Sequence, residues 1–454
     1  MAYFHAIKLT FGSTDYDLMS TNVVVTDYEM RSSEANMVQP TKENPYGYGR
    51  VTESYRLFIE DSTQAAALTR YENLERFLQE AVNQQREFVN TKLRINFQLS
   101  PDAGFWSSPV VAYNLTPTKG FLTSIPQGKI EAELQLTREF YIEYARTQLS
   151  LTSATAGPAT KVRINNSHQN YAYTSSSAVT GTLPAPALTR VYNASGSNIS
   201  MKNVYIGVNA NQNPTALQHI FQGEDVLSFS GLTSQSDATS SGGYYKRNAY
   251  TSGSGAYFAW TPSTAVLNAM AGNMFRVFAK FKNAPASDLF LRMGVGTYVS
   301  PLYLPVWENP EVLNVAGRQL FDFGSMRIPH GNFTNDINYS AGFHITSRPI
   351  NSGNLDLDFV CIMPASGVRH LYQVPSLNTP NNDYVADNSR DGEAYLYSGS
   401  TKYPVFEQYG SPVLLWPQKT NYIYVLTDTS SLGASAPLTA LDVELFCWPR
   451  RLTI

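Results

Sequence analysis

Carboxylates and aromatic rings are the side chains of this sequence whose spacing suggests chemistry. Asp356 and Asp358 stand two residues apart in an apolar run, and paired carboxylates are what a glycosidase or a calcium site would use. Residues two apart on a strand share one face, and a sheet face lacks the backbone carbonyls that a calcium loop supplies. We therefore predict that both aspartates lie on the solvated side of an amphipathic strand and bind no metal.

Aromatic rings gather in and beside a Ser/Gly/Tyr-rich stretch at residues 234–255, which we predict to be a long loop. A sugar ring can be held by aromatic side chains together with a few polar groups. The predicted glycan contacts are Tyr244, Tyr245, Tyr250 and Trp260. The alternative is that Tyr257 and Trp260 belong to the core and that the other rings pack against a neighbouring subunit.

The other reactive residue types show no catalytic pattern. The six histidines lack the spacing of a zinc site, and His344 falls in a strand-like run where a packed or hydrogen-bonded ring is expected. The sequence contains no Gly-x-Ser-x-Gly elbow, Walker loop or dinucleotide-binding fingerprint. We expect no enzymatic activity, no metal and no cofactor.

The composition narrows the class of protein. A chain of 454 residues is longer than a single hydrophobic core usually serves, so two or three domains are expected. Charged residues make up only 15% of it, while it has 29 Tyr and 23 Phe, a balance typical of β-sandwich and virion proteins. The net charge of -3 and the lack of a Lys/Arg-rich run argue against nucleic-acid binding.

Cysteine use and the first residues indicate where the protein is made. Cys361 and Cys447 each lie in an apolar strand-like run, where buried free thiols are expected and a disulfide is the alternative. Residues 1–17 lack the basic and apolar regions of a signal peptide. No window approaches the roughly 20 apolar residues of a membrane span. We expect a product made in a cytoplasm, without a signal peptide or membrane insertion.

The clearest secondary structure lies early in the chain. Apolar residues alternate over residues 51–59, recur every three or four positions over 68–82, and alternate again over 93–99. This change of period predicts a strand, one amphipathic helix and a second strand, with the helix covering an apolar sheet face. Asp61 and Gln64 are predicted to form a capping pair at the start of the helix.

The fold class predicted from these patterns is mainly β and multidomain. The first part is an antiparallel sheet or barrel with one packed helix, and short apolar runs between Gly/Pro/Asn/Ser turns then predict β-sandwich or jelly-roll domains. An alternative for the last part is that its strands close a domain begun near Val162, which makes the jelly roll an insertion. The predicted domains are residues 1–150, a linker with the first β-domain strands at 151–190, a jelly roll at 191–375, and a C-terminal β subdomain at 376–454.

Three features of the sequence carry a resemblance to known proteins. The strand–helix–strand with a hairpin arm at 130–138 is similar to the tail-tube fold, and residues 182–186 (Thr-Leu-Pro-Ala-Pro) lead into a β-sandwich. The stretch Leu-Trp-Pro at 415–417, Asn-Tyr-Ile-Tyr at 421–424 and a strand at 441–448 complete the pattern. Together they resemble tail proteins of tailed bacteriophages, especially distal tail (baseplate hub) proteins. Residues 192–373 resemble a carbohydrate-binding-type jelly roll.

This resemblance implies a non-enzymatic structural protein of the virion tail. It implies that the first domain assembles copies of the chain into a homo-oligomeric ring, at the distal tail, baseplate or tail tube, with the β domains facing outward. The implied partners are the chain itself, neighbouring tail proteins and a host surface glycan. Two other classes stay open, namely a carbohydrate-binding or adhesin module that contacts host glycans without a ring, and a capsid or decoration protein.

Overall fold

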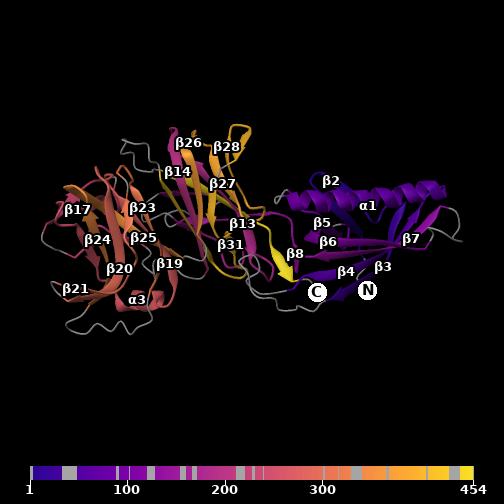
Figure 1. The fold of residues 1–454 in the computed structure, drawn as a ribbon, viewed down its shortest axis with the longest axis horizontal. Coiled ribbons are helices and arrows are strands. Elements are labelled where there is room, and N and C mark those ends of the chain that lie inside the picture. Colours follow the sequence, from indigo (N-terminus) through magenta and orange to yellow (C-terminus); the bar gives the residue numbers. More distant parts are fainter. Residues whose placement is uncertain are drawn as a thin grey trace. The chain divides into compact units, whose positions relative to one another are not determined.

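Antiparallel strands organise the computed structural model of this chain (Figure 1). Contacts divide the chain into unit 1, made of residues 1–147, 180–185 and 448–454, and unit 2, made of residues 148–179 and 186–447. The mainly β, multidomain fold class is confirmed. The residues that the structure describes are 4–32, 49–87, 91–101, 103–119, 128–153, 160–165, 171–210, 220–227, 231–238, 240–299, 302–314, 316–328, 340–364, 368–404, 407–428 and 440–452.

Unit 1 is built on one sheet of nine antiparallel strands, namely β1 (Ala6–Phe11), β2 (Thr14–Asp17), β3 (Val23–Ser32), β4 (Val51–Glu60), β5 (Arg94–Gln98), β6 (Trp106–Lys119), β7 (Lys129–Arg138), β8 (Tyr141–Glu143) and β34 (Arg450–Leu452). Their order is β2-β1-β5-β6-β7-β4-β3, with β8 paired to β6 and β34 paired to β8. Among the described strands, β2 and β3 at the two ends of this path do not pair with each other. Of the predicted sheet or barrel, the open sheet is therefore the form observed.

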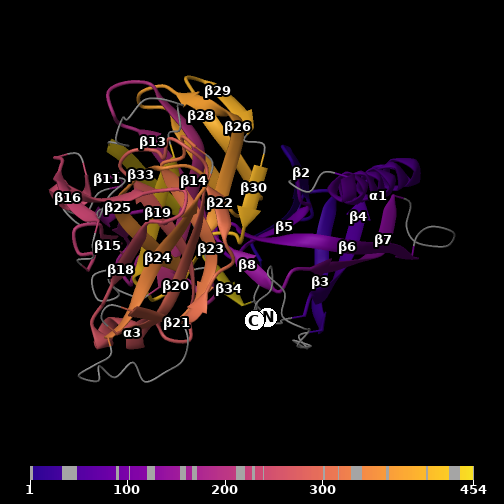
Figure 2. The same ribbon diagram turned by 60° about the vertical axis from the view of Figure 1, so that its left-hand side comes forward.

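The helix α1 (Gln64–Glu87) covers one face of this sheet (Figure 2). Tyr71, Leu74 and Leu78 from its apolar stripe share one buried cluster with Leu57 of β4 and Leu134 of β7. The alternation of β7 matches this arrangement, because every second side chain of the strand is buried and the others are half-buried. The predicted helix and the predicted hairpin arm are confirmed.

The start of α1 differs from the prediction. Thr63 is the capping residue, since its hydroxyl accepts a hydrogen bond from the backbone N–H of Ala66 at 3.1 Å. Asp61 is paired with Arg70 instead, and the Gln64 side chain accepts from a backbone N–H just before β7. The predicted Asp61–Gln64 capping pair is therefore wrong, because both side chains bond elsewhere.

Unit 2 contains a first β-sandwich, here called the first roll. One of its sheets has the order β11-β33-β13-β27-β28-β29, with β9 on β33 and β31 on β13, and the other has the order β10-β12-β32-β14-β26-β30. The bounds are β9 (Thr147–Leu149), β10 (Thr152–Ser153), β11 (Lys161–Asn165), β12 (Tyr171–Tyr173), β13 (Ala185–Asn193), β14 (Ile199–Ala210), β26 (Arg369–Thr379), β27 (Tyr384–Asn388), β28 (Glu393–Ser398), β29 (Thr401–Pro404), β30 (Glu407–Gly410), β31 (Leu414–Leu415), β32 (Asn421–Asp428) and β33 (Ala440–Cys447).

A second sandwich in unit 2, here called the inserted roll, lies between β14 and β26 in the sequence. Its sheets have the orders β16-β17-β25-β19-β23, with β15 on β25, and β18-β24-β20-β21, with β22 on β20. It also contains the short helices η1 (Ser241–Gly243) and α3 (Thr264–Met270), and its strands are β15 (Ile220–Gln222), β16 (Leu232–Ser236), β17 (Tyr244–Tyr250), β18 (Tyr257–Trp260), β19 (Met274–Phe281), β20 (Leu289–Val299), β21 (Leu302–Glu308), β22 (Val312–Asn314), β23 (Leu320–Arg327), β24 (Ser340–Pro349) and β25 (Gly353–Pro364).

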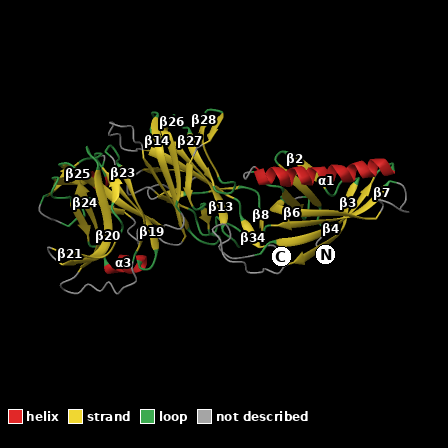
Figure 3. Cartoon of the chain, viewed as in Figure 1, coloured by secondary structure: helices red, strands yellow, loops and turns green. Residues whose placement is uncertain are grey.

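Both sandwiches have the strand order of a jelly roll. The central strands of the first roll are β11-β33-β13-β27 facing β12-β32-β14-β26, and those of the inserted roll are β17-β25-β19-β23 facing β18-β24-β20-β21. In each, the chain passes between sheets in the same sequence. Along the chain, strands of the first roll therefore come both before and after the inserted roll. Strands dominate both rolls in Figure 3, and the short helix α3 stands out in the inserted roll. The predicted domain limits, 191–375 for the jelly roll and 376–454 for the C-terminal subdomain, stay predictions.

The two rolls of unit 2 share a buried interface. Tyr205 and Tyr424 of the first roll lie in one apolar cluster with Phe278, Phe359 and Cys361 of the inserted roll. The rings of Tyr205 and Phe278 have centroids 4.6 Å apart. The β25 sheet is thus buried on both faces, because its other face contributes to the core of the inserted roll.

Two predictions from the sequence are wrong in the inserted roll, one because of burial and one because of strand pairing. Asp356 and Asp358 are buried, so the predicted solvated side of their strand is wrong, because neighbouring segments of the inserted roll cover and bond both carboxylates. The predicted loop at 234–255 is also wrong. Residues 232–236 and 244–250 form the antiparallel pair β16–β17, whose backbone hydrogen bonds do not require apolar side chains.

Candidate functional site

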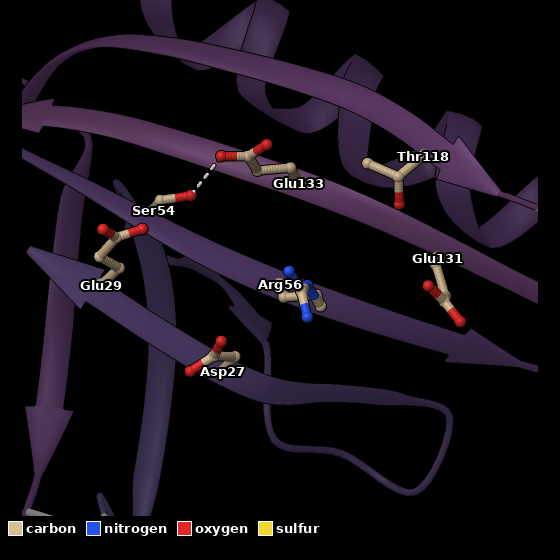
Figure 4. A pocket seen from close by; sticks show the side chains of 7 residues that line it. All are labelled: Asp27, Glu29, Ser54, Arg56, Thr118, Glu131 and Glu133. Atoms are coloured by element: carbon tan, nitrogen blue, oxygen red, sulfur yellow. Dashed lines mark hydrogen bonds between the residues drawn. The ribbon is translucent and has the colours of Figure 1, made fainter. Parts of the chain in front are cut away.

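A polar pocket lies on the face of the unit 1 sheet that α1 does not cover (Figure 4). It holds about 210 Å³ and is open along the surface of β3, β4, β6 and β7. Strand alternation produces it, because the side chains between the buried residues of β4 and β7 all point to this side. The lining residues are Asp27, Glu29, Ser54, Arg56, Thr118, Glu131 and Glu133.

The pocket is acidic. Four carboxylates line it with a single guanidinium, that of Arg56, which stands opposite Asp27 on β3 and opposite Glu133 on β7. Ser54 donates a hydrogen bond to Glu133 at 2.5 Å. The excess of negative charge repels phosphate, and within the described part of the chain no group of three or more His, Cys, Asp or Glu is arranged to hold a metal ion.

Behind the pocket, a buried ionic cluster ties β4 to β7. Glu53 of β4 and Arg138 of β7 form an ion pair at 2.6 Å, and both side chains are almost wholly excluded from solvent. The hydroxyls of Tyr28 and Tyr55 donate to the two oxygens of Glu53 at 2.7 and 2.6 Å. Burial, reinforced by the Glu53 charge, raises the pKa of both tyrosines. Sequence reasoning missed this cluster, although the facing positions of two alternating strands could have indicated it.

The structure separates the four predicted glycan contacts. Tyr250 and Trp260 are buried in the core of the inserted roll, where the indole N–H of Trp260 donates to the carbonyl of Gln222 at 2.9 Å. Tyr244 is 48% exposed, and Tyr245 follows it on β17 next to Arg247. Successive residues of a strand point to opposite faces, so these two rings form no common platform. A glycan contact of Tyr244 or Tyr245 stays a prediction.

The two aspartates singled out by their spacing have different partners. Asp356 accepts two hydrogen bonds from Arg247, at 2.7 and 2.8 Å, and one from Asn283 at 2.6 Å. Asp358 accepts from the backbone N–H of Ser241 at 2.8 Å, and burial raises its pKa to about 7. Each carboxylate is thus held by its own set of partners within the inserted roll.

Asp358 gives the inserted roll a predictable response to pH. Because its folded-state pKa of about 7 lies above the usual 3.8, its contribution to stability is complete at low pH and is lost as the pH rises from about 4 to about 7. We expect Asp358→Asn to remove this loss and to stabilise the roll at pH 8 by on the order of 4 kcal/mol. Thermal unfolding at pH 5 and pH 8 measures it, with exposed Asp225→Asn as the control. An unchanged pH dependence in Asp358→Asn contradicts it.

His344 and the cysteines have structural surroundings. His344 is buried on β24 with its Nε2 2.6 Å from Glu308, and burial lowers its pKa. The ring fits because Gly294 lies beneath it, where a Cβ would stand 2.3 Å from the His344 ring. The expected packed histidine is confirmed. Cys361 and Cys447 are buried free thiols, as predicted, and burial raises the pKa of Cys447 to about 12.

No helix in the described part of the chain is long and apolar enough to cross a membrane. No protein-family model matches the sequence, and no curated protein matches it.

Several solved structures are similar to this chain at low sequence identity. The crystal structure of the phage SPP1 Dit (gp 19.1) protein, described as a paradigm of the hub adsorption apparatus in phages that infect Gram-positive bacteria, is 7% identical, covers 98% of both chains and has a TM-score of 0.35. The phage P2 baseplate in its activated conformation with Ca is 10% identical over 99% of this chain and 98% of the other, with a TM-score of 0.30. The exo-β-1,3-galactanase of Phanerochaete chrysosporium is 12% identical over 76% and 83%, with a TM-score of 0.21.

Proposed function

We propose that this chain is a non-enzymatic structural component of a bacteriophage tail, at the distal tail, baseplate or tail tube. In this proposal copies of the chain assemble into a ring through unit 1 and display the β-sandwiches of unit 2. The observation that carries it is the open sheet of unit 1, which is covered by one helix and ends in two different strands. The order of parts along the chain supports the tail assignment, because it is the order that the sequence resemblance implies.

The two ends of the unit 1 sheet suit repeated self-association. An edge strand carries backbone N–H and C=O groups that need partners, and natural proteins pair, cover or charge such edges. The main path of the sheet ends in β2, with four residues, and in β3, with ten, while β34 ends the branch that leaves β6. Two unlike edges favour head-to-tail contacts between copies, and such contacts close into a ring when the rotation between subunits allows it.

Mass photometry and negative-stain microscopy of the purified full chain test this proposal. We expect closed rings of one size at micromolar concentration. Val24→Lys, which places a charge on the edge strand β3, is expected to reduce the ring fraction at least tenfold. Val312→Lys is the matched control, because Val312 is equally exposed at 36% but lies in the inserted roll. A wild-type chain that stays monomeric contradicts ring assembly and favours a stand-alone binding module.

A further inference from the structure

Unit 1 is completed by a segment that follows all of unit 2 in the sequence. Its strand β34 pairs antiparallel with β8, with Arg450 opposite Glu143 and Leu452 opposite Tyr141. The backbone N–H of Tyr144 donates to the carbonyl of the residue before β34 at 2.8 Å. We call residues 448–452 the closing segment.

An ion-pair cluster fixes the closing segment to the sheet. Glu143 is fully buried, and its carboxylate accepts hydrogen bonds from the Arg450 guanidinium at 2.9 and 2.5 Å. It also accepts one from the Arg94 guanidinium at 2.6 Å. The Arg450 guanidinium also lies 3.8 Å from the ring centroid of Tyr141, and that of Arg451 lies 3.9 Å from the ring of Trp106. Without the closing segment, Glu143 loses the two hydrogen bonds from Arg450 and the strand that pairs directly opposite it.

A second chain segment closes over the first. The backbone N–H groups of Thr182 and Leu183 both donate to the carbonyl of Arg450, at 2.9 and 3.1 Å. Gly181 makes this approach possible, because its φ is +101° and a Cβ there would lie 2.2 Å from the Arg450 carbonyl oxygen. Removing the closing segment would leave these N–H groups without their acceptor.

We propose that the closing segment is an assembly clasp, so that unit 1 becomes able to join a ring only after residues 448–452 dock on β8. The proposal rests on the ring assembly proposed above. Residues 186–447 must be synthesised before the closing segment, so a nascent unit 1 lacks β34 until unit 2 has been made. A fragment ending near residue 150 also lacks it, along with residues 180–185. The clasp thereby ties ring formation to chains that already carry their display domains.

The test uses the full chain with one added methyl group. Gly181→Ala places a Cβ against the Arg450 carbonyl and strains a left-handed position, while Gly12→Ala is the matched control, since Gly12 also has a positive φ in unit 1 and nothing lies within 4 Å of its Cβ position. Hydrogen exchange of residues 182–183 and 141–144 reports docking, and mass photometry reports rings. We expect Gly181→Ala to speed exchange there and to lower the ring fraction at least tenfold, and Gly12→Ala to do neither.

Two outcomes overturn the clasp. One is a Gly181→Ala chain whose segment is released but whose rings match the wild type. The other is the double variant Gly181→Ala/Arg450→Met, which lacks both the carbonyl approach and the ion pair, retaining wild-type protection at residues 182–183. Failure of the ring proposal looks different, because the wild-type chain then forms no rings while its residues 182–183 stay protected.

Discussion

Replacing Glu53 with glutamine is expected to lower the free energy of unfolding of unit 1 by about 3–5 kcal/mol, because Arg138 then keeps its charge in a buried site without a carboxylate. The two tyrosine hydroxyls that donate to Glu53 lose a charged acceptor in the same step. Urea unfolding followed by hydrogen exchange of α1 and β7 amides measures the change in unit 1 by itself.

A control and a rescue separate this charge effect from general damage to β4. Glu60→Gln lies on the same strand, but the Glu60 side chain is 52% exposed and pairs with Lys129 at the surface, so we expect a change below about 1 kcal/mol. The double variant Glu53→Leu/Arg138→Met removes both buried charges and is expected to recover part of the lost stability, because the hydroxyls of Tyr28 and Tyr55 still lose their acceptor. A Glu53→Gln chain as stable as the wild type sinks this prediction.

Phe278→Ala is the second substitution with a large expected effect. Phe278 is fully buried between the two rolls with its ring against Tyr205, so truncation leaves a cavity and costs about 3–5 kcal/mol. Because this interface joins the rolls, we also expect the inserted roll to unfold at lower urea than the first roll in the variant. Fluorescence and far-UV circular dichroism along a urea gradient resolve the two transitions.

Met274→Ala provides the comparison for this substitution. Met274 lies four residues earlier on the same strand β19 and is 47% exposed, so the substitution removes a large side chain without opening a cavity. We expect it to change stability by less than about 1 kcal/mol. Equal losses in Met274→Ala and Phe278→Ala would mean that β19 itself, and not the contact with the first roll, is the sensitive feature.

Local periodicity was sufficient to predict the helix α1 and the strands β4, β5 and β7 of unit 1. The stripe in α1 and the alternation in β7 depend on one buried face each, and a single face leaves a clear period in the sequence. Glu53 shows the limit of this reasoning. It stands among polar residues that suggest solvent, yet it shares the helix-facing side of β4 with Tyr55, and only its partner on β7 makes that position tolerable.

Partners distant in sequence account for what the patterns missed. Asp356 and Asp358 alternate with apolar residues as on a solvated strand, but Arg247 and other residues of the inserted roll that are distant in sequence bond and cover these carboxylates. The predicted aromatic cluster failed to gather for a related reason, because Tyr250 and Trp260 belong to a core assembled from several strands. The acidic pocket and the closing segment likewise combine residues from strands far apart along the chain, which no local period reveals.

The position of the inserted roll has a consequence for how such a protein can diversify. Its two ends join β14 and β26, which are paired neighbours with Ile206 opposite Arg369, so a connection of several residues could in principle replace the inserted roll and keep this pairing. The inserted roll is thus placed where domain insertion, loss or exchange between related genes could occur. Tyr205 and Tyr424 constrain such an exchange, because removing the inserted roll exposes their apolar surface. A replacement module must cover this surface, and a chain without the roll must replace these residues with polar ones.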